Sequence, residues 1–231
     1  MNLPNFDLDL ANRQLNNRTA CQRLEWALDF FDRILISSSF GLQTSVIIDI
    51  VYGRMEKRIP VVFLDTLYHF PETLILAGRF LERYDLNLQI IRPPDAVNRT
   101  QFEEKYGHKL WDRNVDQFHE LTKLRQIRDV LKFRDAWITG IRREQSNTRR
   151  SAQIVEFDAK HNLFKVNPLV DWSRRQVLEY IRANDVPYNS LFEQGYQSIG
   201  DEPLTQPVTD GQHERSGRWI GTEKTECGLH V

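Results

Sequence analysis

The amino-acid sequence predicts a doubly wound α/β fold, with a mostly parallel sheet, followed by a C-terminal tail. Short apolar runs rich in Ile and Val predict buried strands at residues 33–37, 60–65, 87–91 and 136–139. Longer stretches, in which apolar residues recur every three or four positions, predict helices at residues 44–57, 72–84 and 116–134. Alternating strands and helices favour a parallel sheet covered on both faces, because each crossover returns with the same hand.

The length and charge of the chain exclude several functional classes. A chain of 231 residues matches one α/β domain, and 31 basic against 32 acidic residues leave no overall field that would attract nucleic acid or anionic membranes. No stretch approaches the roughly 18 to 20 apolar residues that a bilayer requires, and the N-terminus carries no targeting pattern. We expect a cytoplasmic protein that binds neither nucleic acid nor membranes. We expect its α/β domain over residues 1–205, with a helical segment over about 1–30, and its tail over 206–231.

Two loops follow predicted strands at the edge of the sheet where doubly wound folds bind ligands. The first, ISSSFGLQTS, contains Ser37, Ser38, Ser39 and Gln43 and leads into a helix whose N-terminal N–H groups favour an anion. The second, LDTLYHFPET, starts near Asp65, whose carboxylate suits a polar ligand. Both loops also have ordinary structural explanations, since Ser and Asp are common helix caps.

A basic segment, ITGIRREQSNTRR, follows the fourth predicted strand. It concentrates Arg142, Arg143, Arg149 and Arg150 in a chain whose charge is balanced overall. Guanidinium groups match phosphate and sulfate oxygens in pairs, so the segment predicts a clamp for a ligand with more than one such group. The alternative is a solvated basic loop paired with nearby glutamates.

The end of the chain carries a cysteine among charged residues. Residues 210–231 contain four glycines and few aliphatic residues, which predicts a mobile tail. Cys227 follows Arg215, Arg218 and Lys224, and cations near a thiol favour its nucleophilic thiolate form, whereas Glu226 opposes it. An unremarkable surface thiol is the alternative.

The other cysteine, Cys21, recurs with Leu24 and Leu28 at helical core spacing, so we expect it in the core. Two cysteines are too few for a disulfide framework and show no spacing for zinc or an iron–sulfur cluster.

Six blocks occur in a characteristic order along the chain: SSSFGLQ (37–43), LDTLYHFPET (64–73), TGIRREQS (139–146), KVNPLVDW (165–172), GYQSIGDEPLT (195–205) and KTECGLH (224–230). Together they resemble the thioredoxin-dependent phosphoadenylyl-sulfate (PAPS) reductases, a family of the adenine-nucleotide α-hydrolase-like fold group. The resemblance runs through most of the chain and implies a nucleotide-binding domain with a catalytic tail.

Two differences from neighbouring families indicate which branch of this fold group the chain resembles. Related ATP pyrophosphatases carry S-G-G-x-D-S in the first loop, whereas this chain has S-F-G-L-Q-T, with Gln43 in place of the acid that helps hold a metal. Related adenylyl-sulfate (APS) reductases carry a Cys pair and a later C-x-x-C, which together hold an iron–sulfur cluster. The corresponding positions of this chain are Leu121-Thr122 and residues 201–204, DEPL, and they contain no cysteine. Four thiolates are needed to hold such a cluster. The resemblance therefore implies the cluster-free branch, with no metal, iron–sulfur cluster or flavin, and a substrate with an additional 3′-phosphate.

The resemblance implies that Cys227 attacks the sulfur of PAPS, forms an S-sulfocysteine and yields adenosine 3′,5′-bisphosphate and then sulfite, for cysteine biosynthesis. Thioredoxin, or alternatively glutaredoxin, then supplies the electrons. We also expect a homodimer. By similarity, we expect the phosphosulfate or nucleotide to be bound by Ser37, Ser38, Ser39 and Gln43, and the adenosine by Asp65. The phosphates are expected to be bound by Arg142, Arg143, Arg149 and Lys109. The residues expected to move with the tail and close over the sulfonate are Arg215, Arg218, Lys224 and His230.

Three alternatives stay open at this point. The first is a cluster-free reductase that uses APS. The second is an ATP-using sulfurtransferase or ligase on the same fold, which Gln43 disfavours because the metal-binding acid is missing. The third is a nucleotide sensor without catalysis, but a sensor would have no need of the thiol in the KTECGLH segment.

Overall fold

The structure is a computed structural model that describes residues 6–209, 211, 213–222 and 224–229. Its strands are β1 (Ile34–Ser37), β2 (Val61–Leu64), β3 (Leu88–Ile91), β4 (Ala136–Ile138), β5 (Val155–Asp158) and β6 (Leu163–Val166). Its α-helices are α1 (Leu8–Leu15), α2 (Ala20–Phe30), α3 (Leu42–Ile48), α4 (Pro71–Tyr84), α5 (Arg99–Tyr106), α6 (Leu110–Arg113), α7 (Val115–His119), α8 (Arg125–Leu131) and α9 (Arg174–Ala183). Its π-helical turns are η1 (Asp49–Arg54) and η2 (Glu120–Leu124), and its 3₁₀ turns are η3 (Arg143–Gln145), η4 (Asn147–Arg149), η5 (Ser190–Gln194) and η6 (Glu202–Leu204).

Within the described residues, the strands form one sheet in the order β3-β2-β1-β4-β6-β5. All neighbours are parallel except the β5–β6 pair. The four predicted strands are confirmed. The β5–β6 hairpin was not predicted, because Val155–Asp158 and Leu163–Val166 mix polar with apolar residues, as is common in a hairpin at a sheet edge.

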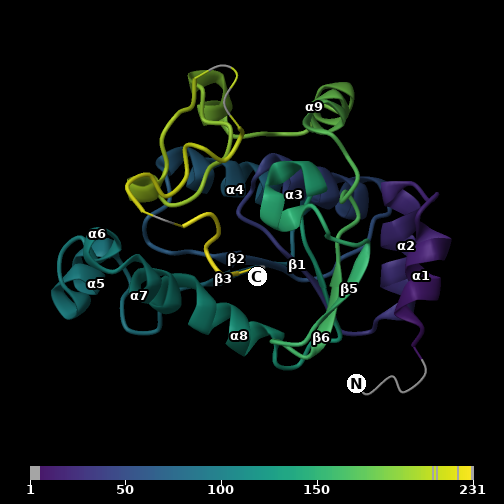
Figure 1. Ribbon diagram of the computed structural model, residues 1–231, viewed down its shortest axis with the longest axis horizontal. Coiled ribbons are helices and arrows are strands. Elements are labelled where there is room, and N and C mark those ends of the chain that lie inside the picture. The colour runs from purple at the N-terminus through teal and green to yellow at the C-terminus, as the bar shows by residue number, and fades with distance from the viewer. Residues whose placement is uncertain (1–5, 210, 212, 223, 230–231) are drawn as a thin grey trace.

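Side chains alternate between the two faces of the sheet, and each face has its own helices. Ile34 and Ile36 of β1 belong to the main core, which also contains residues of α3 and α4. Leu35 points the other way and packs with Ile127 and Leu131 of α8. Figure 1 shows α3 and α4 on one side of the strands and α8 on the other. The doubly wound α/β class is therefore confirmed.

Two of the predicted helices are irregular. The helix predicted over 44–57 begins at Leu42 and widens into η1, where buried Asp49 accepts hydrogen bonds from the hydroxyls of Tyr84 (2.8 Å) and Tyr180 (2.7 Å). The helix predicted over 116–134 is α7, η2 and α8, and it ends at Leu131. Apolar spacing does not distinguish a π-helical turn from the α-helix that it interrupts, because the insertion shifts the pattern by only one residue.

The tail packs on a second, smaller core formed by residues of α5, α6 and α7. Trp219 is buried there with Phe102, Phe118 and other aromatic residues. Backbone hydrogen bonds from Gln206 to Gly217 (2.8 Å) and from Trp219 to the Leu204 carbonyl (3.0 Å) fix the start of the tail. A Cβ on Gly217 would lie 2.2 Å from the Gln206 carbonyl oxygen, so only glycine permits this approach. That the tail moves during turnover stays a prediction.

No helix in the part of the chain that the structure describes is both long and apolar enough to span a bilayer.

Candidate active site

A cavity of about 190 Å³ lies at the carboxyl edge of the sheet, beneath the tail. It opens beside β1, from which β2 and β3 extend to one side and β4 to the other. This reversal of strand order is where doubly wound folds bind their ligands. Of the predicted site residues, the cavity is lined by Ser37, Ser38, Ser39, Gln43, Arg149, Arg215, Arg218 and Cys227.

The first loop is held rigidly by its own hydroxyl groups. The hydroxyl of Ser37 accepts from the indole N–H of Trp137 (2.6 Å), and that of Ser38 accepts from the backbone N–H of Phe40 (2.9 Å). Ser38 also donates to the hydroxyl of Thr44 (3.0 Å). Phe40 is in the left-handed region (φ 53°), and its ring is buried against those of Phe63 and Phe80. The burial of this aromatic ring offsets the cost of its backbone conformation.

Gln43 faces the segment that follows β4. A Cβ on Gly140 would lie 2.9 Å from the Cβ of Gln43, so glycine lets the two segments meet. With its amide oxygen turned toward the guanidinium of Arg142, Gln43 accepts from Nε (3.1 Å) and Nη2 (3.2 Å). The position that holds an acid in the related pyrophosphatases is thus occupied here by a neutral group bound to an arginine.

Glu226, next to the cysteine, joins two cavity arginines. Its carboxylate accepts two hydrogen bonds from Arg149 (2.8 Å each) and one from Arg215 (2.9 Å). Burial would raise the pKa of Glu226, but the two arginines outweigh it and lower the pKa below its usual value. Burial and the neighbouring charge of Arg149 lower the pKa of Arg215 to about 10, so it stays a cation at neutral pH.

Arg218 has no carboxylate within ion-pair distance among the described residues. Its guanidinium lies 4.5 Å from the centroid of the Trp219 ring, and Nη1 donates to the hydroxyl of Ser198 (3.4 Å). Burial lowers the pKa of Arg218, and its Nε has no hydrogen-bond partner. Gly200 allows this arrangement, because a Cβ there would lie 2.0 Å from Nη2. Arg218 therefore supplies positive charge that no carboxylate neutralises directly.

Cys227 is a free, half-buried thiol in the wall of the cavity. The residues on both sides of it are anchored: Glu226 to the arginines, and the Gly228 carbonyl to Nζ of Lys160 (3.2 Å). Leu229 packs against the core on the α8 face. Cys21, in contrast, packs against the main core, and burial raises its pKa.

Five predicted site residues lie away from the cavity wall. Asp65 accepts from Nε of Arg92 (2.8 Å) and from the backbone N–H of Leu67 (3.0 Å). Lys109 lies at the start of α6 in the left-handed region (φ 51°). Nε of Arg143 donates to the Ala152 carbonyl (2.7 Å).

The other two are Lys224, which pairs with Asp116, and Arg142, which is fully buried. His230 lies outside the described residues. Substrate binding by these residues stays a prediction.

A buried polar cluster beside the cavity was missed by the sequence analysis. Lys123, which lines the cavity, forms an ion pair with Asp201. Asp201 also accepts from the hydroxyl of Thr66 (2.8 Å) and lies 3.9 Å from Nε2 of His119. Burial lowers the pKa of His119 to about 3, and neither ring nitrogen has a hydrogen-bond partner. His69 also lines the cavity, where its Nε2 lies 2.9 Å from the Leu64 carbonyl oxygen.

One signal for this cluster was present in the sequence. Asp201 is the first residue of the DEPL segment, and Lys123 directly follows Leu121-Thr122. These two segments correspond to the positions of the iron–sulfur cluster ligands in the APS reductases. The structure brings these two places together through the ion pair between Lys123 and Asp201. His69 lies in the second loop, LDTLYHFPET, whereas no sequence pattern singles out His119.

The comparisons with known proteins agree on the family. Residues 33–207 match the phosphoadenosine phosphosulfate reductase domain. The chain is 38% identical to an adenosine 5′-phosphosulfate reductase of Shouchella clausii, over 97% of this chain and 93% of that protein. It is 37% identical to a phosphoadenosine phosphosulfate reductase of Saccharomyces cerevisiae, over 96% of this chain and 89% of that protein.

A solved structure gives the same result. The phosphate complex of the PAPS reductase from Candida auris has a TM-score of 0.79 and 32% identity, covering 87% of this chain and 95% of that one. The likeness confirms the adenine-nucleotide α-hydrolase-like fold. The chain therefore belongs to the phosphoadenosine phosphosulfate reductase family, and it is a reductase of sulfate assimilation.

Proposed function

We propose that the protein reduces PAPS to sulfite and adenosine 3′,5′-bisphosphate through a covalent adduct on Cys227. One observation carries the proposal: Cys227 lies in the same cavity as the serine-rich first loop and the cations Arg149, Arg215 and Arg218. A nucleophile, an anion site and the ligand-binding edge of a doubly wound sheet thus coincide.

In the first step, the Cys227 thiolate attacks the sulfur of the sulfo group. A sulfur–sulfur bond forms, the bond from sulfur to the phosphate oxygen breaks, and adenosine 3′,5′-bisphosphate leaves with the electron pair. Thiolate and substrate are both anions, and their repulsion at low effective dielectric costs several kcal/mol unless cations offset it. Arg218 fits this task best, because no carboxylate among the described residues neutralises it directly.

In the second step, a thiolate of reduced thioredoxin attacks the sulfur of Cys227 and releases sulfite. The mixed disulfide is then resolved by the second thiol of thioredoxin, so that the dithiol is oxidised and Cys227 returns as a thiol. Cys227 is a half-buried residue of the tail and faces the cavity, so the tail has to open for a protein partner to reach it. Glutaredoxin is the alternative donor.

Four thiolates that could hold an iron–sulfur cluster do not occur in this chain. It contains two cysteines, and Cys21 packs against the main core while Cys227 packs against the smaller one. Of the positions that correspond to cluster ligands, Asp201 forms an ion pair with Lys123, the residue that follows Leu121-Thr122. A cluster does not fit these residues, and we propose a reaction without metal, cluster or flavin, in which the donor dithiol supplies both electrons. We also propose that the protein is a homodimer.

APS is the second candidate substrate, since the similar Shouchella clausii protein carries the name of an APS reductase. The two substrates differ only by the 3′-phosphate. We propose PAPS because the chain lacks the cysteines of the cluster-containing APS reductases and is similar to PAPS reductases from two yeasts.

The test compares sulfite release from PAPS and from APS with reduced thioredoxin as the donor. We expect kcat/KM to be at least tenfold higher for PAPS, since the 3′-phosphate adds a charged contact of roughly 1.4 kcal/mol or more. A higher kcat/KM for APS would assign the second candidate, and no sulfite from either substrate would refute both.

A further inference from the structure

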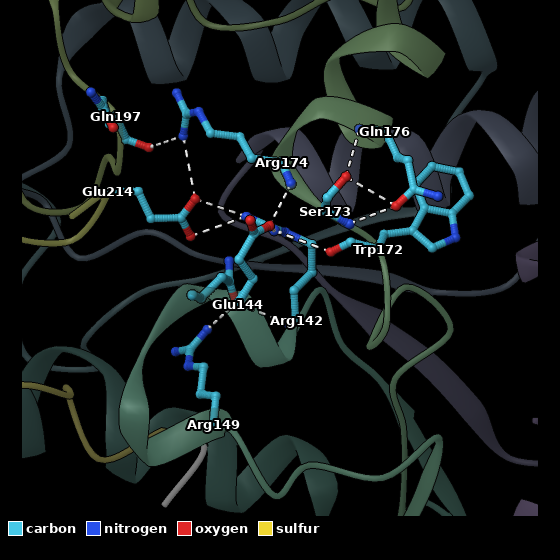
Figure 2. Close-up of polar contacts among 10 residues, drawn as sticks. Arg142, Glu144, Arg149, Trp172, Ser173, Arg174, Gln176, Gln197 and Glu214 are labelled. Atoms are coloured by element: carbon cyan, nitrogen blue, oxygen red, sulfur yellow. Dashed lines mark hydrogen bonds and ion pairs between the residues drawn. The ribbon is translucent and has the colours of Figure 1, made fainter. Parts of the chain in front are cut away.

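Arg142 is fully buried, and its hydrogen-bonding groups are taken up by protein atoms. Nη1 donates to Glu144 (2.8 Å) and to the Trp172 carbonyl (3.2 Å). Nη2 donates to both carboxylate oxygens of Glu214 (3.1 and 2.8 Å). Figure 2 shows the guanidinium of Arg142 between these partners. A phosphate could bind Arg142 only by displacing a buried carboxylate, so Arg142 is poorly suited to bind substrate directly.

Glu214 belongs to the tail and binds the domain at two points. Besides Arg142, it contacts Nη1 of Arg174 at the start of α9 (3.4 Å), which also donates to the Gln197 carbonyl (3.1 Å). The side chain of Glu214 is only 10% exposed. A buried carboxylate that accepts charged hydrogen bonds from two arginines is a strong local anchor, because removal of one partner leaves the others unpaired.

The position of Glu214 in the sequence connects this anchor to the cavity. Arg215 is the next residue, and Arg218 follows three positions later; both line the cavity. Gln43, on the opposite wall, shares the guanidinium of Arg142 with Glu214. Arg142 therefore bridges the first loop and the beginning of the tail.

We propose that Glu214 and Arg142 form a latch, a positioning pair that holds the tail closed so that Arg215, Arg218 and Cys227 face the cavity. Glu214 itself lines the cavity, but it reaches the buried Arg142 behind the cavity wall. The latch thereby differs from the pairs that Glu226 forms with Arg149 and Arg215, two arginines that line the cavity themselves. The closed tail is defined by the structure alone, and only the effect on turnover rests on the proposed function.

The experiment measures how fast iodoacetamide alkylates Cys227 in the free enzyme, by peptide mapping, with Cys21 as an internal reference. Glu214→Gln keeps the size of the side chain but removes the charge that both arginines bind. We expect about tenfold faster alkylation of Cys227, as loss of one buried charged contact allows, and an unchanged rate at Cys21. Glu214→Asp retains the charge and is expected to restore part of the protection.

The matched control is Glu144→Gln, which removes a carboxylate from the same guanidinium without touching the tail. The side chain of Glu144 is 56% exposed, and its loss is expected to leave alkylation of Cys227 within about twofold of the wild type. Equal alkylation rates in Glu214→Gln and wild type would overturn the latch, as would an equal increase in Glu144→Gln.

Turnover gives the second readout. A latch that only positions the tail predicts that Glu214→Gln lowers kcat/KM for the sulfonucleotide, and that Glu214→Asp recovers part of it. If the wild type releases no sulfite, the proposed function fails, whereas the alkylation result still decides whether the latch exists. Faster alkylation with unchanged kcat/KM would refute its positioning role.

Discussion

The first loop and the C-terminal tail line the same cavity but are held by different forces. The first loop continues a central strand of a parallel sheet: the backbone N–H of Ser38 donates to the Val62 carbonyl (2.9 Å), and Phe40 is buried in the main core. The tail is held by backbone hydrogen bonds at its start, by the carboxylates Glu214 and Glu226, which bind arginines, and by the buried ring of Trp219.

This difference separates a fixed wall from a movable one. Sheet hydrogen bonds and core packing break only when the domain unfolds, whereas the arginine–carboxylate contacts of the tail can break locally while the domain stays folded. The fold therefore supplies a rigid wall at the ligand-binding edge of the sheet, and we propose that the charged tail covers or exposes its thiol. The proposed reaction needs both, because its adduct would form in a closed site and be reduced in an open one.

The largest predicted effect concerns the free energy of unfolding. It compares Phe40, in the first loop, with Trp219, in the tail. Phe40→Ala is expected to lower the free energy of unfolding by about 3–5 kcal/mol, because it leaves a cavity in the main core. Trp219→Ala is expected to cost less in global stability, since the tail can detach while the domain stays folded. Urea denaturation measures both.

Limited proteolysis distinguishes the two variants further. We expect Trp219→Ala to be cleaved within residues 206–229 under conditions in which the wild type stays intact. A global loss for Trp219→Ala as large as that for Phe40→Ala would show that the tail is part of the main folding unit and contradict the contrast.

The next effect concerns the charge in the movable wall. Arg218→Gln is expected to lower kcat/KM by about 10²-fold, because it removes the cation that has no carboxylate partner among the described residues. Arg175→Gln, at an exposed position on α9, is the control and should retain the wild-type value. Steady-state sulfite formation measures both, and equal values for the two variants would remove Arg218 from the site.

These contrasts also show how far the sequence alone leads. Runs such as residues 60–65 identify strands because a buried parallel strand is apolar on both faces, and the strand order then brings the first loop to the ligand-binding edge. The sequence cannot tell buried Arg142 from its neighbour Arg143, since their partners Glu214 and the Ala152 carbonyl are chosen by tertiary packing. Tertiary packing likewise pairs Lys123 with Asp201, 78 residues away, although the resemblance draws attention to Asp201 and to the two residues before Lys123.

The smallest predicted effect is a pH dependence of the free energy of unfolding, which arises from the buried side chain of His119 beneath the tail. Burial lowers the pKa of His119 to about 3 from an ordinary value of 6.5. Below pH 6.5 the unfolded chain binds a proton that the folded protein does not, so the free energy of unfolding falls as the pH is lowered toward 3. The slope from this group is at most about 1.4 kcal/mol per pH unit.

Urea denaturation between pH 6.5 and 4.5 tests this expectation. His119→Phe should reduce the slope, while part of it remains because burial lowers the pKa of His69 as well. His213→Asn, at an exposed position in the tail, should behave as the wild type does. An unchanged slope in His119→Phe would mean that His119 does not bind its proton differently in the folded and unfolded states.

Covalent catalysis by Cys227 is tested most directly by trapping the adduct. The purified, reduced protein is mixed with PAPS without any thiol donor and examined by intact-mass and peptide mass spectrometry, with Cys227→Ser as the control. We expect a gain equal to one SO₃ group on the peptide that contains Cys227, release of one equivalent of adenosine 3′,5′-bisphosphate, and loss of the added mass when reduced thioredoxin is supplied. Sulfite formation by Cys227→Ser, or turnover by the wild type with no added mass on Cys227, would contradict it.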